Sequence, residues 1–311
     1  MNILFIIIGL TLLIFGGDWL LKASIGISLR LKISKIVIGM TVVSFATSVP
    51  ELIVSLNSAL KGSADLALGN VIGSNIANLA LVLAITILIA SISVEKSFYK
   101  TDWPVMMMAS GLLYYFIALD GLLERYEGAI LFISLIIFLV YLLKFQKPTQ
   151  TIDEEDLSDP VSPYKLFFFL VIGGLGLWGG SELLINGAVG IAQYFEVSER
   201  IIGITIVSIG TSVPELAASI IAIIKKEKAI SLGNLVGSNV FNILAVLGIT
   251  AMVTPISVTD QNLINSDIVW MLAISFLILP LSFIPKIMKF GWKEGLILIS
   301  IYGAFMFKMF Y

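Results

Sequence analysis

Two segments of the chain repeat each other at one constant offset. The segment Gly39–Leu52 reads GMTVVSFATSVPEL, and the segment Gly203–Leu216, which begins 164 residues later, reads GITIVSIGTSVPEL. Ten of these 14 positions are identical. The same offset aligns Leu68–Leu79 with Leu232–Ile243, where seven of 12 positions agree. A single ungapped offset across two separated motifs indicates that the chain arose as an internal duplication.

The composition places this duplicated chain in lipid. Hydrophobic residues make up 58% of the 311 residues and charged residues only 13%. A soluble domain has about 45–50% apolar and about 25% charged residues, so a water-soluble fold is excluded. The chain has no Cys and no His, which excludes thiol chemistry and Cys-based or His-based metal sites. Any bound metal ion therefore needs oxygen ligands, as Na⁺, Ca²⁺ and Mg²⁺ do.

Ten apolar stretches are long enough to cross a bilayer, which takes about 20 mainly apolar residues. They are expected at residues 2–22, 36–60, 66–91, 103–120, 127–144, 164–190, 201–224, 229–253, 268–285 and 294–310. We therefore predict an all-α membrane protein with ten transmembrane helices. It would consist of an N-terminal five-helix repeat (1–144), an acidic cytoplasmic linker (145–163) and a C-terminal five-helix repeat (164–311).

The basic residues favour one orientation in the membrane. If the N-terminus lies outside, 15 of the 19 Lys and Arg residues fall in inside loops, and the opposite orientation reverses this ratio. The positive-inside rule therefore predicts that both termini lie outside. Because each repeat contains an odd number of spans, the two repeats must enter the membrane from opposite sides. Inverted repeats with interrupted helices are typical of secondary transporters, whose binding sites lie near the bilayer midplane.

One glutamate occupies the same position in each repeat. Glu51 and Glu215 lie inside apolar spans, and the repeated motifs contain no Lys or Arg. A carboxylate at mid-bilayer costs at least about 2.5–3.5 kcal/mol, so it needs a polar cavity and a counter-charge. A mobile cation is the natural partner. The alternative is a protonated glutamate that bonds to a neighbouring helix.

A proline stands directly before each glutamate. Proline removes a backbone N–H, clashes with the carbonyl four residues earlier and disfavours helical angles at the residue before it. We therefore expect helix breaks at Thr47–Pro50 and Thr211–Pro214, with carbonyls freed from about Ser44 and Ser208 onward. Together with hydroxyls and a carboxylate, these carbonyls would form an oxygen cage for Ca²⁺ or Na⁺. A simple packing kink is the alternative.

Each half also carries a polar stripe on the following span, because three residues recur at intervals of four. The stripes are Asn70, Ser74 and Asn78, and Asn234, Ser238 and Asn242. We interpret them as neutral oxygen ligands that face the glutamates. The alternative is hydrogen bonding between helices, which Asn and Ser often provide in membranes. This alternative is at least as good for Asn70, Asn75, Asn234 and Asn239.

These motifs resemble those of the calcium/cation antiporter superfamily, specifically its prokaryotic sodium/calcium exchanger branch. The resemblance covers the ten-span layout and is most specific in Thr-Ser-Val-Pro-Glu and Gly-Asn-x-x-Gly-Ser-Asn-x-x-Asn. It implies an inverted core in which several Na⁺ exchange for one Ca²⁺ at overlapping sites. It also implies that the first span of each half slides to switch access between the two sides.

The resemblance further implies which residues hold the ions. Ca²⁺ would be bound by Glu51, Glu215 and the carbonyls of Thr47 and Thr211. One Na⁺ site would use Glu51, Ser74, Ser212 and the Ser208 carbonyl. The symmetric Na⁺ site would use Glu215, Ser238, Ser48 and the Ser44 carbonyl, with Asn78 and Asn242 flanking the centre.

The chain departs from the family pattern at two positions. Many exchangers carry Asp where this chain has Asn242, so the site has two carboxylates, and the potassium-dependent branch is disfavoured. Ala46 stands where Gly is usual, which we expect to alter local flexibility. Proton/calcium exchangers typically place the glutamate after Gly-Asn, so a proton-coupled antiporter of Ca²⁺ or another divalent cation is the alternative function.

We therefore expect an antiporter that uses Na⁺ entry to expel Ca²⁺, with no cofactor. A cation channel, which would conduct without a counter-ion, is a second class. An enzyme is disfavoured because the chain has no Cys or His, no Gly-x-Ser-x-Gly elbow and no phosphate-binding loop. The expected partners are Na⁺, Ca²⁺ and the lipid bilayer, without nucleotide or nucleic acid. The expected form is a monomer in the prokaryotic plasma (inner) membrane.

Overall fold

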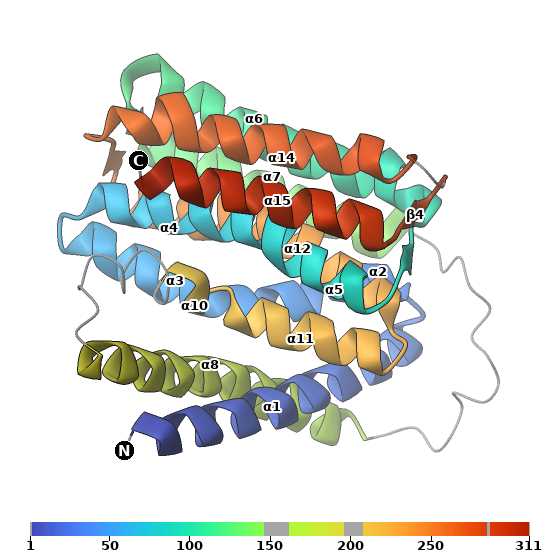
Figure 1. Ribbon diagram of the computed structural model, residues 1–311. Helices are drawn as coiled ribbons and strands as arrows, with labels where there is room; N and C mark the ends of the chain where they lie inside the picture. Colours follow the sequence, from blue (N-terminus) through green and yellow to red (C-terminus); the bar gives the residue numbers. More distant parts are fainter. Residues whose placement is uncertain (1, 146–161, 196–207, 285–286, 311) are drawn as a thin grey trace. The chain divides into compact units, whose positions relative to one another are not determined.

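The computed structural model describes residues 2–145, 162–195, 208–284 and 287–310, which are almost entirely helical (Figure 1). Eight helical segments of this described part are long and apolar enough to cross a membrane. They are Asn2–Leu31, Lys35–Leu60, Ala64–Ile89, Phe98–Asp120, Arg125–Phe145, Pro163–Tyr194, Lys228–Val253 and Leu263–Leu281. Most of the expected acidic linker, and the start of the span expected at 201–224, lie outside the described residues.

The elements of the two halves follow the same order. The first half contains α1 (Asn2–Leu31), α2 (Lys35–Ile38), α3 (Ser44–Leu60), α4 (Ala64–Ala77), α5 (Leu83–Ile89), β1 (Ile92–Ser93), α6 (Trp103–Asp120), β2 (Leu122–Leu123) and α7 (Arg125–Phe145). The second half contains α8 (Pro163–Tyr194), α10 (Ser208–Gly210), α11 (Val213–Ile224), α12 (Lys228–Phe241), α13 (Gly248–Val253), β3 (Ile256–Ser257), α14 (Ile268–Leu281), β4 (Lys289–Phe290) and α15 (Trp292–Phe310).

Wider π-helical turns interrupt several of these helices. They lie at Gly39–Val43, Asn78–Val82, Phe98–Asp102, Asn242–Leu247 and Leu263–Asp267. The turn between α4 and α5 and the turn between α12 and α13 both begin at the last asparagine of the polar stripe. These turns are not predicted from the sequence.

Large apolar side chains are exposed along the helices. Phe167 in α8, Ile137 in α7 and Phe276 in α14 are 67%, 65% and 59% exposed, respectively. A soluble protein rarely exposes so many large apolar side chains along its helices. Together with the eight candidate spans, this surface identifies an integral membrane protein.

The chain packs as two compact units, and each unit takes parts of both halves. Unit 1 is Met1–Thr47 and Phe145–Asn234, and unit 2 is Ser48–Lys144 and Leu235–Tyr311. These packing units are a different division from the two repeats of the sequence analysis, whose boundaries remain a prediction.

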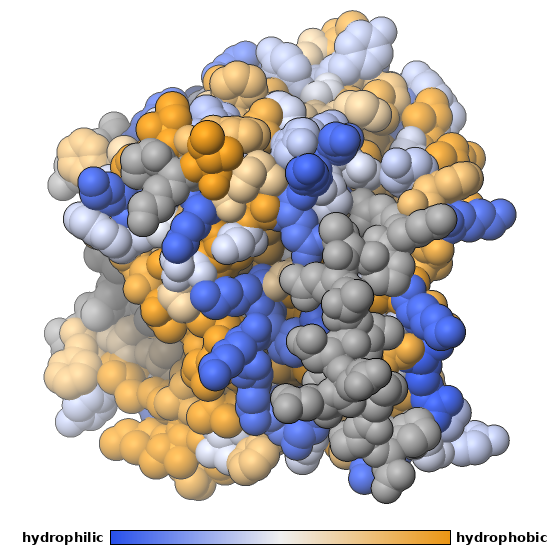
Figure 2. All heavy atoms as spheres, turned by 90° about the vertical axis from the view of Figure 1, so that its right-hand side faces the viewer, coloured by the Kyte–Doolittle hydropathy of each residue, from blue (hydrophilic) through white to orange (hydrophobic). Residues whose placement is uncertain are grey.

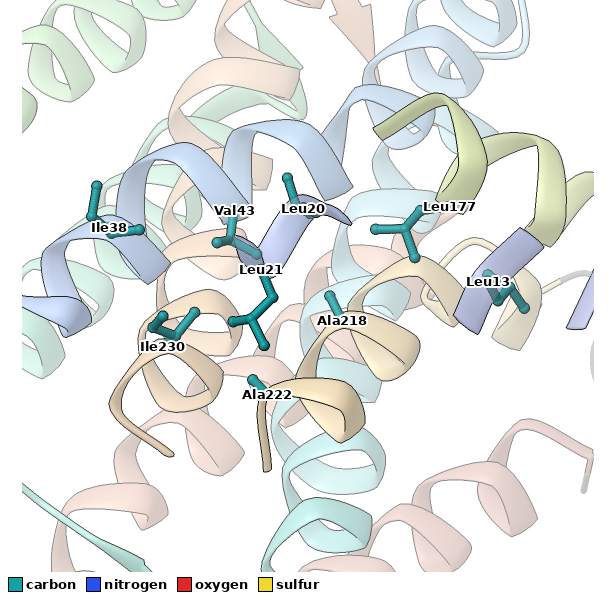
Figure 3. Close-up of a cluster of buried hydrophobic side chains, with 9 residues drawn as sticks. All are labelled: Leu13, Leu20, Leu21, Ile38, Val43, Leu177, Ala218, Ala222 and Ile230. Carbon is teal, nitrogen blue, oxygen red and sulfur yellow. The ribbon is translucent and has the colours of Figure 1, made fainter. Parts of the chain in front are cut away.

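The core of unit 1 joins α1 to α8 and α11. Its buried apolar side chains are Leu13, Leu20, Leu21, Ile38, Val43, Leu177, Ala218, Ala222 and Ile230 (Figure 3). α1 and α8 approach closely because glycines stand at their contact. A Cβ atom on Gly16 would lie 2.7 Å from the backbone nitrogen of Leu177, and one on Gly173 would lie 2.6 Å from that of Leu20. Larger residues at these two positions would force the helices apart.

Two short strand pairs link the halves inside unit 2. β1 pairs with β4, and β2 pairs with β3, both antiparallel. Since α6 leads from β1 to β2, the two pairs belong to opposite ends of α6. Figure 2 faces the end that carries β4 and shows hydrophilic side chains gathered there. Lysines in or near β1 and β4 in sequence include Lys96, Lys100, Lys289 and Lys293.

The expected helix break at Thr47–Pro50 is wrong. α3 continues from Ser44 to Leu60 with Pro50 inside it. In the second half the helix is interrupted, because α10 ends at Gly210 and α11 begins at Val213. The residue four before each proline differs: it is Ala46 in the first half and Gly210 in the second. Alanine favours a helix by about 1 kcal/mol over glycine, which accounts for the direction of this difference.

Candidate functional site

The predicted ion ligands divide evenly between the two units. Unit 1 contains Ser44, Thr47, Ser208, Thr211, Ser212 and Glu215. Unit 2 contains Ser48, Glu51, Ser74, Asn78, Ser238 and Asn242. The side chain of Ser208 lies outside the described part, and Thr211 is partly buried. The other ten side chains are buried, which is unusual for so many polar groups and calls for specific partners.

Both glutamates are fully buried. Glu51 and Glu215 are each 0% exposed. Glu51 lies within α3 directly after its proline, whereas Glu215 lies in the first turn of α11. The two equivalent carboxylates therefore occupy different positions in their helices.

Asn234 is the centre of a hydrogen-bond network in unit 1. Its side-chain nitrogen donates to Ser219 Oγ at 3.1 Å and to the Glu215 carbonyl at 3.5 Å. Thr47 Oγ1 donates to Asn234 Oδ1 at 3.2 Å, and Ser44 Oγ donates to the Asn234 carbonyl at 2.9 Å. One amide therefore connects the start of α3 with the glutamate-bearing helix α11.

The second half satisfies one of the carbonyls that its proline leaves without a partner. Pro214 has no N–H to donate to the carbonyl of Gly210. Ser181 Oγ from α8 donates to that carbonyl at 2.8 Å. The proline was expected to free this carbonyl for an ion, but the carbonyl already has a protein partner.

Unit 2 contains the repeat-equivalent of the hydrogen bond between Asn234 and Ser219. Asn70 Nδ2 donates to Ser55 Oγ at 3.1 Å, and both residues lie 164 positions before Asn234 and Ser219. The alternative interpretation of Asn70 and Asn234, hydrogen bonding between helices, is therefore confirmed.

Four asparagines bond reciprocally in the centre of unit 2. Asn78 Nδ2 donates to Asn239 Oδ1 at 3.3 Å, and Asn242 Nδ2 donates to Asn75 Oδ1 at 3.1 Å. The offset of 164 residues relates the two bonds to each other, because Asn78 is equivalent to Asn242 and Asn75 is equivalent to Asn239. Each bond joins the asparagine that begins one π-helical turn to a residue of the other half. π-Helical turns frequently mark functional sites.

Four of the buried ligand candidates keep an oxygen atom without a hydrogen-bond partner among the described residues. These atoms are Ser48 Oγ, Ser212 Oγ, Asn78 Oδ1 and Asn242 Oδ1. They form two pairs that are related by the offset of 164 residues. Buried oxygens of this kind are costly in a protein unless they bind water or a cation. The arrangement can supply neutral oxygen ligands to hard cations.

Comparison with known proteins fits this chemistry. The sequence profile described as sodium/calcium exchanger protein matches residues 1–144 and 165–311. The chain belongs to this family. It is thus one of a family of exchangers, which are transporters and not enzymes, and the family assignment from the sequence motifs is confirmed.

Two prokaryotic relatives align with nearly the whole chain, and they carry the names "Putative antiporter CaxA" and "Sodium/calcium exchanger MaX1". CaxA of Alkalimonas amylolytica is 37% identical over 314 residues, covering 99% of this chain and 98% of its own length. The sodium/calcium exchanger MaX1 of Methanosarcina acetivorans is 29% identical and covers 100% of this chain and 99% of its own length.

The fold is also that of an exchanger of known structure. The sodium-calcium exchanger NCX_Mj, soaked with 2.5 mM Na⁺ and 0.1 mM Ca²⁺, superposes with a TM-score of 0.82 at 28% identity. The alignment covers 97% of this chain and 96% of that one. These findings establish a cation antiporter of the Ca²⁺-exchanging family.

Proposed function

We propose that the protein exchanges Na⁺ for Ca²⁺ by alternating access, so that Na⁺ entering down its gradient drives Ca²⁺ out. The observation that carries the proposal is the pair of fully buried glutamates, Glu51 and Glu215, at equal positions of the repeat. Na⁺ and Ca²⁺ both prefer oxygen ligands but differ twofold in charge. The two ions can therefore compete for the same carboxylates.

The proposed Ca²⁺ ligands are the carboxylates of Glu51 and Glu215 with the carbonyls of Thr47 and Thr211. Two carboxylates balance the charge of one Ca²⁺ or of two Na⁺. The proposed Na⁺ sites add hydroxyls and serine carbonyls to each glutamate. They comprise Ser74, Ser212 and the Ser208 carbonyl with Glu51, and Ser238, Ser48 and the Ser44 carbonyl with Glu215.

The burial and bonding of individual ligands support these sites. Ser48 and Ser212 each keep a hydroxyl without a partner among the described residues, and Asn78 and Asn242 each keep an amide oxygen. The hydroxyl proton of Ser44, in contrast, is directed to the carbonyls of Gly39 and Asn234, with Oγ 2.8 and 2.9 Å from their oxygens. The role proposed for Ser44 uses its backbone carbonyl.

The pairing of the short strands supports ten spans in an inverted arrangement. Paired strands lie on one side of the membrane, so an even number of crossings separates β2 from β3. Between them α7, α8 and the segment Lys228–Val253 supply three candidate spans. The segment that contains α10 and α11 would supply the fourth. On this arrangement, equivalent strands of the two halves lie on opposite sides of the membrane.

The charges near the strands support the orientation. Four lysines lie in or near β1 and β4 in sequence, whereas Asp120, Glu124 and Asp260 lie near β2 and β3 together with Arg125. By the positive-inside rule the β1–β4 end lies in the cytoplasm, and both termini lie outside. We further propose a monomer in the prokaryotic inner membrane, with repeats at 1–144 and 164–311 around a cytoplasmic linker, and without a cofactor.

The test uses purified protein in liposomes loaded with Na⁺. Dilution into Na⁺-free buffer should drive uptake of radiolabelled Ca²⁺, and either Glu51→Gln or Glu215→Gln should abolish it. Glu294→Gln is the matched control, because Glu294 is also buried but only caps α15 through a bond from the Gly291 N–H. Uptake that ignores Na⁺ and follows an imposed pH gradient would overturn sodium coupling and favour proton exchange.

A further inference from the structure

We propose that Asn75 and Asn239 are positioning residues that turn the side-chain oxygens of Asn242 and Asn78 toward the transported cation. The inference rests on the proposed function, because it assigns these two oxygens to the ion path. Neither Asn75 nor Asn239 is among the ligands proposed above. All four asparagines lie in unit 2 and are at most 1% exposed.

Two methionines orient the side-chain amides of Asn75 and Asn239. Asn75 Nδ2 lies 3.7 Å from Met271 Sδ, and Asn239 Nδ2 lies 3.8 Å from Met106 Sδ. A thioether sulfur accepts hydrogen bonds but cannot donate one, so it faces the nitrogen of an amide. Asn75 Nδ2 also donates to the Asn239 carbonyl at 3.3 Å. The nitrogen side of each amide is therefore fixed, and its oxygen must face the other way.

These fixed oxygens in turn orient the next amide. Asn75 Oδ1 accepts from Asn242 Nδ2 at 3.1 Å, and Asn239 Oδ1 accepts from Asn78 Nδ2 at 3.3 Å. If Asn242 or Asn78 rotated by half a turn, two amide oxygens would meet without a proton between them. The bond therefore keeps the amide nitrogen of Asn242 or Asn78 on the side of its asparagine partner and the amide oxygen on the opposite side.

The two amide oxygens that face away from these hydrogen bonds are the atoms that would bind a cation. Asn78 Oδ1 and Asn242 Oδ1 are buried and have no hydrogen-bond partner among the described residues. Amide carbonyls are ordinary ligands for Ca²⁺. An NH₂ group in the same place would repel the ion, so the value of each asparagine as a ligand depends on its orientation.

Each orienting chain alternates between the two halves of the sequence. One runs from Met106 to Asn239 and Asn78, and the other runs from Met271 to Asn75 and Asn242. Partners that orient metal ligands typically contribute about 10–100-fold to metal affinity. We expect the same order of effect on the Ca²⁺ concentration at half-maximal transport.

The test compares Asn75→Leu in two backgrounds. In the native background we expect the KM for Ca²⁺ to rise about tenfold with a smaller change in maximal rate. In the Asn242→Asp background we expect no rise, because both carboxylate oxygens are equivalent and need no orientation. Met271→Leu, which keeps the volume and removes only the acceptor, should raise the KM in the same direction by a smaller factor.

A purely structural role for Asn75 gives a different result. Asn75→Leu would then raise the KM by the same factor in both backgrounds, and the proposal would be overturned. The repeat supplies an independent pair, Asn239→Leu with and without Asn78→Asp, which gives the same comparison if the first variant does not fold. Wild-type liposomes that show no Na⁺-driven Ca²⁺ uptake would instead refute the proposed function itself.

Discussion

Asn234 donates its side-chain amide to Ser219 Oγ at 3.1 Å and so joins α12 to α11. Asn70 makes the equivalent bond to Ser55 at the same length, 164 residues earlier in the chain. Thr47 and Ser44 of α3 also donate to the side-chain and backbone oxygens of Asn234. Among the described residues, Asn234 thus bonds to two helices, α3 and α11, and Asn70 bonds to α3.

This difference predicts unequal effects of matched substitutions. Asn234→Ala removes one hydrogen bond from each of two buried hydroxyls, those of Ser219 and Thr47, whereas Asn70→Ala removes one from Ser55. A hydrogen bond of this kind contributes about 0.5–1.5 kcal/mol to stability. We expect Asn234→Ala to lower the Tm of the detergent-solubilised protein clearly more than Asn70→Ala does. Equal losses would show that the network around Asn234 adds nothing to stability.

Close packing at Gly39 predicts a second pair of effects. A Cβ atom on Gly39 would lie 2.5 Å from the carbonyl oxygen of Ile230, whereas one on Gly111 in α6 would meet no atom within 4 Å. Overpacking of this kind typically costs about 1–3 kcal/mol. We expect Gly39→Ala to lower the Tm, and Gly111→Ala to leave it unchanged or raise it, because alanine favours helix. A Tm for Gly39→Ala at or above that of Gly111→Ala would contradict this contact.

The strand pairs predict the sidedness of two exposed serines. Ser93 in β1 and Ser257 in β3 occupy equal positions of the repeat, and both are exposed. Because the chain has no Cys, Ser93→Cys and Ser257→Cys each create a single reactive thiol. We expect a membrane-impermeant thiol reagent to label Ser257→Cys from outside intact cells and Ser93→Cys only after the inner face is exposed. Labelling of both from the same side would exclude inverted repeats.

The two prolines show which structural features can be predicted from the sequence and which cannot. The repeated motifs, eight of the ten expected spans and the burial of the two glutamates could be predicted from residue types and their spacing. The backbone conformation at the repeated motif could not be predicted in this way. Pro50 lies within the continuous helix α3, whereas in the second half the helix is interrupted before Pro214. The decisive features lie outside the identical residues: Ala46 against Gly210 in the motif, and Ser181 on α8, which satisfies the Gly210 carbonyl.

The orientation of the amides was also beyond sequence reasoning. Asn75 and Asn239 are visible in the repeat, but their partners Met271 and Met106 lie in apolar spans without any recognisable motif. The packing of α14 against α4, and of α6 against the π-helical turn that follows α12, brings those sulfur atoms to the amides. The π-helical turns at Asn78 and Asn242 likewise have no residue signature that separates them from ordinary helix.

The central claim is that Ca²⁺ movement is coupled to Na⁺. The most direct measurement sets equal Ca²⁺ on both sides of proteoliposomes, holds pH equal with buffer, and records the direction of net Ca²⁺ flux as the Na⁺ gradient is inverted. If Ca²⁺ transport is coupled to Na⁺, net Ca²⁺ flux runs opposite to the movement of Na⁺ down its gradient. The flux then reverses when the Na⁺ gradient is inverted, and it vanishes in Glu51→Gln. A flux that keeps its direction when Na⁺ is inverted, and reverses instead with an imposed pH gradient, would contradict this coupling.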